Sequence, residues 1–399
     1  MKKFNKFLSV AVASAMVMSM AGCGNTDNGS AATGTNAATE SAASGSVFKI
    51  GGIGPTTGGA AVYGLAVQHG AEIAVEEINA AGGINGYQIE FKFQDDEADA
   101  EKSVNAYNAL KDWGAQIIDG STTSGACIAV TDKTKEDNMF QITPSGSAVE
   151  CVQYDNNFRV CFSNPNQGLA SAQYIGENGL AEKIAVIYDS SDVYSSGIYE
   201  KFVKEAENQP FEVVAAEAFT ADNKTDFSVQ LQKAKDAGAD MVFLPIYYQE
   251  SALILTQAAA MGYAPKWFSC DGMDGILGGV DNFDVSLTEG VMLLTPFAAD
   301  ATADLTQSFV TKYKEKYGET PNQFAADSYD AIYVIKAAIE KSGVTPDMSV
   351  SDICDGMKAA MTEITVDGLT GNGMTWTADG EANKAPKAVV IENGAYKAM

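Results

Sequence analysis

The sequence predicts an α/β protein with two Rossmann-like lobes, and three observations support this fold class. About 350 residues follow the first 46, more than one compact core usually holds. Short apolar runs alternate with amphipathic segments along this length, as expected for parallel strands covered by helices. The alternation begins near residue 47 and begins again near residue 183, so each series is expected to form its own lobe.

The first series opens with an apolar run at residues 48–53, and the glycine-rich loop at residues 54–59 follows it. An amphipathic helix comes next, with one apolar face at Val67, Ala71, Ala74 and Ile78. Ala81-Gly82-Gly83 is expected to end this helix. The other strands of the series are predicted at residues 89–93, 116–119 and 140–143.

The second series opens with an unbroken apolar run at residues 183–188, which is typical of a strand buried on both faces of a parallel sheet. A late helix places Ser328, Ile332, Ile335 and Ile339 on one face. The turn Asn393-Gly394 follows the last predicted strand. Strands of this series are predicted at residues 213–219, 241–246, 267–270, 291–295 and 388–391.

Residues 1–22 have the layout of a secretory signal. Three lysines precede an apolar stretch at residues 7–20, which is too short for a stable membrane span. Ala21-Gly22-Cys23 then resembles a bacterial lipobox, although Met20 stands where leucine is more usual. We therefore expect cleavage before Cys23, a lipid anchor on Cys23, and a flexible Gly/Ala/Ser/Thr tether over residues 23–46. The alternative is an ordinary signal with a coincidental cysteine.

The charge of the chain disfavours several classes of function. The formal net charge is −26, and removal of residues 1–22, which carry three lysines and no acids, would leave −29. Such a surface argues against nucleic acid and anionic lipid as partners. His69 is the only histidine, so no His-rich metal site or cofactor motif is expected. Cys151 and Cys161 are either a disulfide or, in the preferred interpretation, buried free thiols.

Loops rich in hydroxyl groups follow the predicted strands of the first lobe. Residues 119–125 and 143–147 combine serine and threonine with free backbone N–H groups at helix starts, which suits a carboxylate ligand. Simple helix capping is the alternative. The loop at residues 54–59 lacks the spacing of a phosphate-binding loop. In the second lobe, acids and tyrosines at residues 189–194, 246–248 and 270–272 suit an ammonium group and an adjoining side chain.

Several stretches, in this order and spacing, resemble a known family. They are Tyr63-Gly64, residues 76–86, Ile142-Thr143-Pro144, residues 158–162 with 166–168, and residues 328–331. From about Val47 to the C-terminus the chain resembles the type I periplasmic binding proteins of the leucine/isoleucine/valine-binding branch. This resemblance implies two lobes that close on a solute about a hinge of three crossovers. The crossovers are expected near residues 162–166, 295–298 and 374–378, which assigns 47–162 with 298–374 to lobe 1 and 166–295 with 378–399 to lobe 2.

The resemblance also implies the ligand contacts. Ser124, Ser145 and Ser147 match residues that hold the ligand's carboxylate and amino groups, and Asp271 matches the acid that pairs with the ammonium. Tyr194 and Tyr247 match aromatics that cover the ligand, while Tyr63 and Tyr329 fall at positions that line the side-chain pocket. Thr122 and Thr123 replace larger apolar groups, so branched-chain specificity is left open.

The expected function is therefore binding rather than catalysis. We expect a monomer, lipid-anchored outside the cytoplasm at the cell surface or in the periplasm, that captures an amino acid, branched-chain or related. It would deliver this cargo to the permease subunits and ATPases of an ABC importer. The alternatives are an amide, urea-like or carboxylate ligand, or a role as the ligand-sensing partner of a membrane receptor. An enzyme would have to work through Asp189, Asp271 and the hydroxyl loops.

Overall fold

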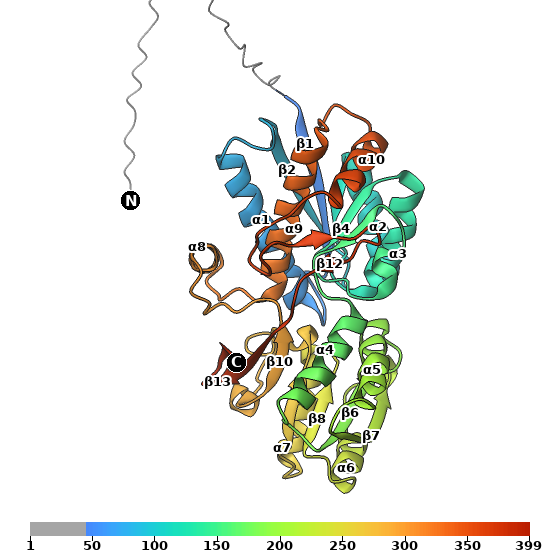
Figure 1. The fold of residues 1–399 in the computed structure, drawn as a ribbon, viewed down its shortest axis with the longest axis vertical. Coiled ribbons are helices and arrows are strands. Elements are labelled where there is room, and N and C mark those ends of the chain that lie inside the picture. Colours follow the sequence, from blue (N-terminus) through green and yellow to red (C-terminus); the bar gives the residue numbers. More distant parts are fainter. Residues whose placement is uncertain (1–44) are drawn as a thin grey trace, which may run out of the picture. The chain divides into compact units, whose positions relative to one another are not determined.

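The structure, a computed structural model, describes residues 45–399 (Figure 1). The predicted signal, the predicted lipidation site Cys23 and nearly all of the predicted tether lie outside the described residues. Within the described part no helix is long and apolar enough to cross a membrane. The same residues contain no cluster of three or more His, Cys, Asp or Glu side chains arranged to hold a metal ion.

Lobe 1 is built on a parallel five-stranded sheet with the order β2-β1-β3-β4-β5. Its strands are β1 (Val47–Gly54), β2 (Gln88–Asp95), β3 (Ile117–Asp119), β4 (Phe140–Thr143) and β5 (Asn157–Arg159). Its helices are α1 (Ala61–Ala80), α2 (Ala100–Trp113), α3 (Ser124–Asp137), α9 (Gln323–Ser342) and α10 (Val350–Met361), and α8 (Asp304–Tyr317) packs on α1. Ile50 and Ile117 face α1 and α9, whereas Ile53 and Ile118 face α2 and α3, so helices cover both faces of the sheet.

Lobe 2 is built on a seven-stranded sheet with the order β14-β13-β10-β9-β8-β6-β7. Its strands are β6 (Lys183–Asp189), β7 (Glu212–Phe219), β8 (Met241–Leu244), β9 (Lys266–Ser269), β10 (Met292–Thr295), β13 (Lys387–Glu392) and β14 (Ala395–Ala398). Its helices are α4 (Asn164–Glu177), α5 (Val193–Ala206), α6 (Ser228–Asp236) and α7 (Tyr248–Ala260). Residues of α4 and α5 pack on one face and residues of α6 and α7 on the other.

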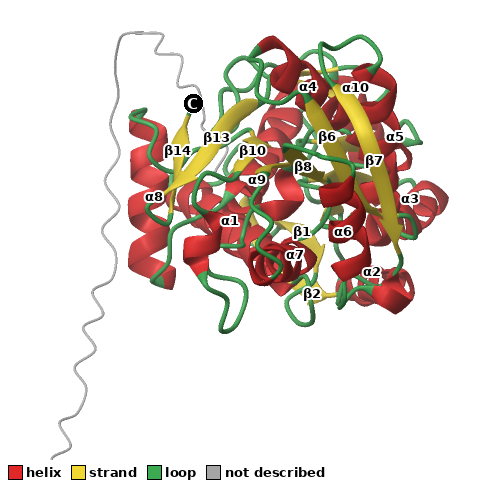
Figure 2. Ribbon diagram, turned by 90° about the horizontal axis from the view of Figure 1, so that it is seen from below, coloured by secondary structure: helices red, strands yellow, loops and turns green. Residues whose placement is uncertain are grey.

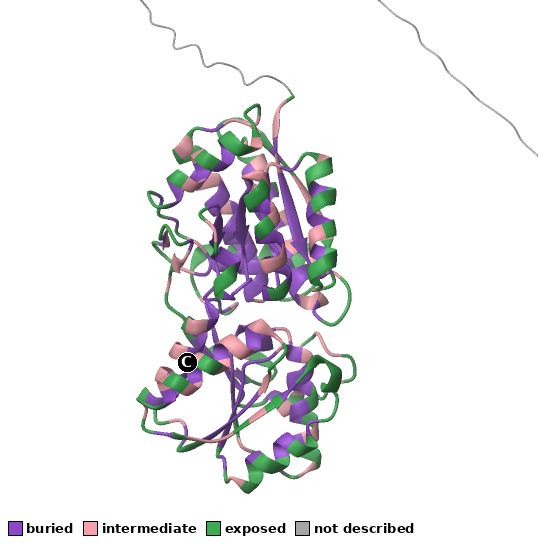
Figure 3. Cartoon of the chain, turned by 90° about the vertical axis from the view of Figure 1, so that its right-hand side faces the viewer, coloured by how far each residue is buried: buried purple, intermediate pink, exposed green. Residues whose placement is uncertain are grey.

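The last hairpin closes one edge of this second sheet. β13 runs antiparallel to β10, and β14 returns along β13 (Figure 2). The turn between them is Asn393-Gly394, and both of these residues have positive φ. The central strands of both lobes are buried, as the two-sided helix cover requires (Figure 3). The predicted α/β fold with two doubly wound lobes is confirmed.

The third crossover differs from its predicted position. Residues 374–383 form a short hairpin, β11 (Thr375–Trp376) with β12 (Ala382–Asn383), that stays on lobe 1. The Trp376 indole donates to the Arg159 carbonyl at 2.8 Å, and the Arg159 N–H donates to the Gly380 carbonyl at 3.0 Å. The prediction that lobe 2 resumes at residue 378 was therefore wrong, because the chain crosses only after Asn383.

The five cysteines within residues 45–399 are all free and buried. Cys151 and Cys161 therefore do not form a disulfide, which settles the alternative that the sequence left open. Cys127 and Cys151 belong to one small apolar cluster with Ala148, so these thiols pack as part of the core.

Candidate ligand-binding site

The predicted hydroxyl loops and the predicted acid meet at one cavity between the lobes. It lies at the carboxyl ends of the strands of both sheets, where ligands of doubly wound folds bind. The cavity is about 10 Å³, roughly the room of one water molecule. Its lining residues are Tyr63, Thr122, Thr123, Ser124, Ser145, Tyr194, Tyr247, Asp271, Gly272 and Phe324.

Lobe 1 contributes a set of hydroxyl groups held by backbone contacts. Ser124 begins α3, and its Oγ accepts the backbone N–H groups of Ser147 and Ala148, each at 3.1 Å. With two donors bound, the Ser124 hydroxyl proton is left for an acceptor, and Ser147 Oγ is 3.4 Å away. Ser145 Oγ, by contrast, donates to the Thr122 carbonyl at 2.6 Å and is already engaged. Ser124 is therefore the donor that the geometry leaves for a carboxylate.

Thr122 and Thr123 behave differently, although they are neighbours. Thr122 Oγ1 donates to the Ile53 carbonyl of strand β1 at 3.2 Å, so its hydroxyl proton is not available to a ligand. Thr123 is the N-cap of α3 but makes no side-chain cap bond. Within the described part of the chain, its buried Oγ1 has no hydrogen-bond partner. Capping therefore does not explain Thr123, which is the lining residue with an unsatisfied polar atom.

Lobe 2 contributes Asp271, the one charged residue that lines the cavity. The Tyr194 hydroxyl donates to Oδ1 at 2.6 Å, and the Gln167 amide donates to Oδ2 at 2.7 Å. Burial raises the pKa of Asp271 to about 7, although these two donors act to lower it. Asp271 is thus a fixed carboxylate that takes up a proton near neutrality.

Four aromatic rings complete the wall. Tyr194 stacks on Tyr247 with ring centroids 5.0 Å apart, and Tyr63 packs edge-on against Tyr247 at 5.5 Å. Phe324, from the first turn of α9, lies 4.5 Å from Tyr63. The rings line the cavity from both lobes, and the contact of Tyr63, Tyr194 and Tyr247 with a ligand stays a prediction.

Two predicted residues do not line the cavity. Tyr329 is wrong as a pocket residue: it lies farther along α9, and its hydroxyl donates to Glu77 at 2.7 Å. A helix that presents Phe324 to the cavity carries Tyr329 more than one turn away, where it packs on Phe309 instead. Ser147 lies behind Ser124 and contacts it rather than the cavity.

Sequence reasoning missed two residues that shape the site. Phe324 was overlooked although it stands two residues after the N-cap Asn322, at the helix end that faces the strand ends. Gln167 belongs to the stretch at residues 166–168 that carries the family resemblance, yet no role is predicted for it, and it holds Asp271 from α4. No local signal links Gln167 to Asp271, because they are 104 residues apart in the chain.

The sequence of the chain matches a known protein family. The profile of the family described as "Periplasmic binding protein" matches residues 47–395 of the chain. The protein belongs to the periplasmic binding protein family. The predicted resemblance is confirmed, and the family is one of substrate-binding transport proteins rather than enzymes.

Relatives and solved structures within this family share both sequence and fold. "Leu/Ile/Val-binding protein homolog 3" of Brucella melitensis is 30% identical over 75% of this chain and 80% of its own. The "Leucine-, isoleucine-, valine-, threonine-, and alanine-binding protein" of Pseudomonas aeruginosa is 30% identical over 74% of this chain and 79% of its own. The crystal structure of the branched-chain amino acid transporter substrate-binding protein LivJ from Streptococcus pneumoniae, in complex with isoleucine, is 28% identical with a TM-score of 0.79. The match covers 88% of this chain and 99% of that one. The chain is thus a solute-binding protein of an ABC transporter.

Proposed function

We propose that this periplasmic binding protein captures an α-amino acid outside the cytoplasm and delivers it to an ABC importer. One observation carries the proposal. The Ser124 hydroxyl of lobe 1, at the start of α3, and the Asp271 carboxylate of lobe 2 line a single cavity. An α-amino acid carries the complementary pair of charges two bonds apart.

The chemistry of each half supports this assignment. Ser124, at the start of α3, offers its hydroxyl and the positive end of a helix to a carboxylate. Asp271 offers an anion to the ammonium, while the rings of Tyr194 and Tyr247 cover the ligand and can add cation–π attraction. One ligand therefore completes contacts on both lobes at once.

Binding and closure are then linked. A ligand that contacts both lobes has its full set of interactions only in the closed form, so its binding energy shifts the hinge equilibrium toward closure. The closed form would dock as a monomer on the permease and its ATPases, and the lipid on Cys23 would keep it at the membrane. A dissociation constant of about 1 μM, roughly −8 kcal/mol, suits a carrier that must release its cargo.

A second candidate ligand class is favoured by the raised pKa of Asp271. With a pKa of about 7, Asp271 is partly protonated near neutrality and can donate to an amide carbonyl or a second carboxylate. The amide, urea-like and plain carboxylate ligands therefore remain the alternative cargo for the same fold.

A thermal-shift screen of the purified protein tests the proposal. The panel would contain the free amino acids, their amides, and the matching carboxylates without the amino group. A ligand at 100 times its dissociation constant adds about 2.7 kcal/mol, enough to raise the midpoint by a few degrees. A shift with α-amino acids supports the proposal. A shift with amides or plain carboxylates alone would contradict it and leave the transport class standing.

A further inference from the structure

The Tyr63 ring forms one wall of the cavity and is held there by the opposite lobe. Its hydroxyl donates to the Gly272 carbonyl and accepts the Tyr248 N–H at 3.1 Å. Tyr63 lies on α1 of lobe 1, whereas both partners belong to lobe 2. These bonds therefore join the two lobes in this structure and fix the ring between them.

The Tyr63 ring is enclosed on all sides by other residues. Tyr63 is 1% exposed. Its centroid lies 4.5 Å from the ring of Phe324 and 5.1 Å from that of Tyr248. A ligand side chain that reached beyond Tyr63 would have to displace the ring, break both buried hydrogen bonds and reopen the lobe contact. Tyr63 therefore closes one end of a cavity that has room for only about one water molecule, so any bound ligand must widen it, and a shorter side chain needs the smaller displacement of the ring.

A second observation concerns the polarity of the same cavity. Thr123 is 6% exposed and lines the cavity, and within the described residues its Oγ1 lacks any hydrogen-bond partner. A buried hydroxyl left unpaired is costly, so a ligand group that pairs with it is favoured over one that does not. A short ligand side chain with its own hydroxyl meets both conditions.

We propose that the site selects small α-amino acids with a short hydroxyl-bearing side chain, serine or threonine, over leucine and isoleucine. Tyr63 sets the length limit and Thr123 supplies the matching hydrogen bond. This specificity rests on the proposed function, since it takes the ligand to be an α-amino acid. It departs from the Leu/Ile/Val-binding name of the Brucella relative and from the isoleucine in the Streptococcus structure, whereas the name of the Pseudomonas relative includes threonine.

Isothermal titration of the wild-type protein with serine, threonine, alanine, leucine and isoleucine is the primary test. We expect serine or threonine to bind at least about tenfold tighter than leucine and isoleucine, the scale on which a closed pocket discriminates by size. Tighter binding of leucine or isoleucine would overturn the specificity and leave the proposed function intact. Failure of every α-amino acid to bind would overturn both.

Two variants assign the effect to its residues. Thr123→Val keeps the shape of the side chain and removes its hydroxyl. The affinity for serine and threonine should therefore fall about tenfold, while the affinity for alanine, the internal reference, should change less than about twofold. Tyr63→Ala should raise the affinity for leucine relative to serine about tenfold. Tyr329→Phe, which alters a tyrosine hydroxyl outside the cavity, is the matched control and should leave both ratios unchanged.

Ratios that do not move in Thr123→Val or Tyr63→Ala would overturn the roles given to those residues. If Tyr63→Ala does not fold, Tyr63→Phe replaces it, because it keeps the ring and removes the two bonds to lobe 2. In Tyr63→Phe the ratio of leucine to serine affinity should still rise, and an unchanged ratio there would overturn the length limit.

Discussion

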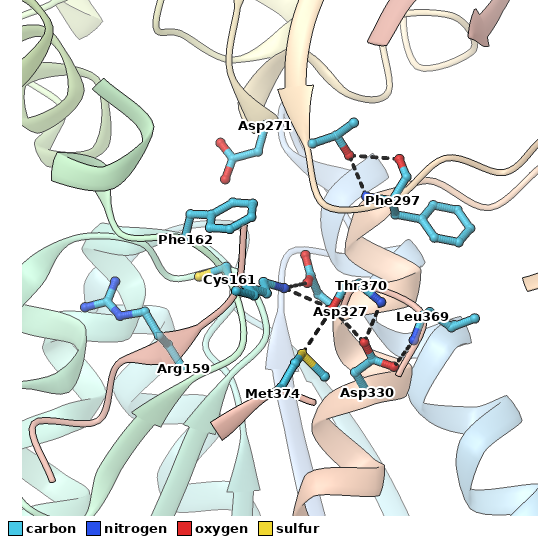
Figure 4. A network of polar contacts seen from close by, with 12 residues as sticks. Arg159, Cys161, Phe162, Asp271, Phe297, Asp327, Asp330, Leu369, Thr370 and Met374 are labelled. Carbon is cyan, nitrogen blue, oxygen red and sulfur yellow. Dashed lines mark hydrogen bonds and ion pairs between the residues drawn. The ribbon is translucent and has the colours of Figure 1, made fainter. Parts of the chain in front are cut away.

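The Lys384 ammonium lies 2.8 Å from the Asp327 carboxylate, and the two side chains are only 1% and 3% exposed. Figure 4 shows Asp327 close to Thr370 in the network of polar contacts around it. Lys384 also donates to Thr370 Oγ1 at 2.9 Å and lies over the Phe162 ring, 5.2 Å from its centroid. It sits on the third crossover, whereas Asp327 belongs to α9 of lobe 1. The ion pair therefore fastens the third crossover to lobe 1 as far as Lys384.

Lys384→Met should destabilise the protein by about 3–5 kcal/mol, because it leaves Asp327 buried without its counter-ion. The double variant Lys384→Met/Asp327→Leu removes both charges and should recover most of that loss. Urea unfolding of the three proteins measures the difference. A single variant as stable as the wild type would show that the pair does not fasten the hinge.

Ligand affinity should fall as the pH falls below about 7. The pKa of Asp271 is raised to about 7 by burial, and only the ionised form pairs with an ammonium. Below that pH the dissociation constant should rise toward roughly tenfold per pH unit. Asp327, which pairs with Lys384, lies in the same buried region, and burial raises its pKa to about 6, so it also titrates in this range. The pH profile of Asp271→Asn is therefore the reference, because it keeps the titration of Asp327 and removes that of Asp271. A profile of the wild type as flat as that of Asp271→Asn would contradict the ammonium role.

The ligand-free protein should show the opposite trend in stability. The folded-state pKa of Asp271 lies above its unfolded value, so the folded state binds the extra proton. The resulting stability is fully present below about pH 4 and is lost as the pH rises through about 7. Unfolding free energies of wild type and Asp271→Asn over this range measure the contribution as their difference.

Gln167→Met should weaken amino acid binding at neutral pH by about 1–3 kcal/mol, since it removes a donor from a buried carboxylate. Without that donor the pKa of Asp271 rises further, so the pH profile of binding should move to higher pH. Asn166→Met, at an exposed neighbouring position, is the control. A weaker affinity with an unmoved profile would mean that Gln167 acts on packing rather than on the charge of Asp271.

Substitution by alanine should have opposite effects on stability at two helical glycines. A Cβ on Gly70 would lie 2.0 Å from the Ala325 carbonyl oxygen, so Gly70→Ala should push α1 from α9 and cost about 1–3 kcal/mol. A Cβ on Gly125 meets nothing within 4 Å, so Gly125→Ala should stabilise by about 0.5–1 kcal/mol. Thermal unfolding of both variants checks the contrast, and an equal response would place the α1–α9 contact in doubt.

The strands that sequence predicted best are those buried by apolar side chains on both faces. The run at residues 183–188 became β6, and residues 140–143 became β4 with the same bounds. β5 could not be predicted, because Asn157 and Arg159 are polar and nevertheless buried. Arg159 is paired with Glu381 at 3.3 Å, a contact that only the folded hairpin creates. The position of the third crossover could not be predicted either, because the contacts that hold residues 374–383 on lobe 1 form only in the folded hairpin.

The sequence indicates those polar residues of the candidate site that come directly after predicted strands. Ser124 and Asp271 each come just after a strand, and the edge where parallel strands end brings them to one cavity. The sequence does not indicate which turn of α9 faces that cavity, so it favours Tyr329, whereas Phe324 lines the cavity in the structure. The pairing of Gln167 with Asp271 and the unpaired hydroxyl of Thr123 depend on side-chain directions that no sequence pattern carries.

The most direct test of the central claim is a titration of wild type and Asp271→Asn with one α-amino acid and with the same acid lacking its amino group. If one ligand contacts both the carboxylate donors of lobe 1 and Asp271, the substitution should weaken binding of the amino acid about 100-fold or more. The reason is that it leaves the buried ammonium group of the ligand without its counter-charge. Binding of the acid without the amino group should stay within about twofold. An amino acid that binds Asp271→Asn as tightly as the wild type would contradict the account.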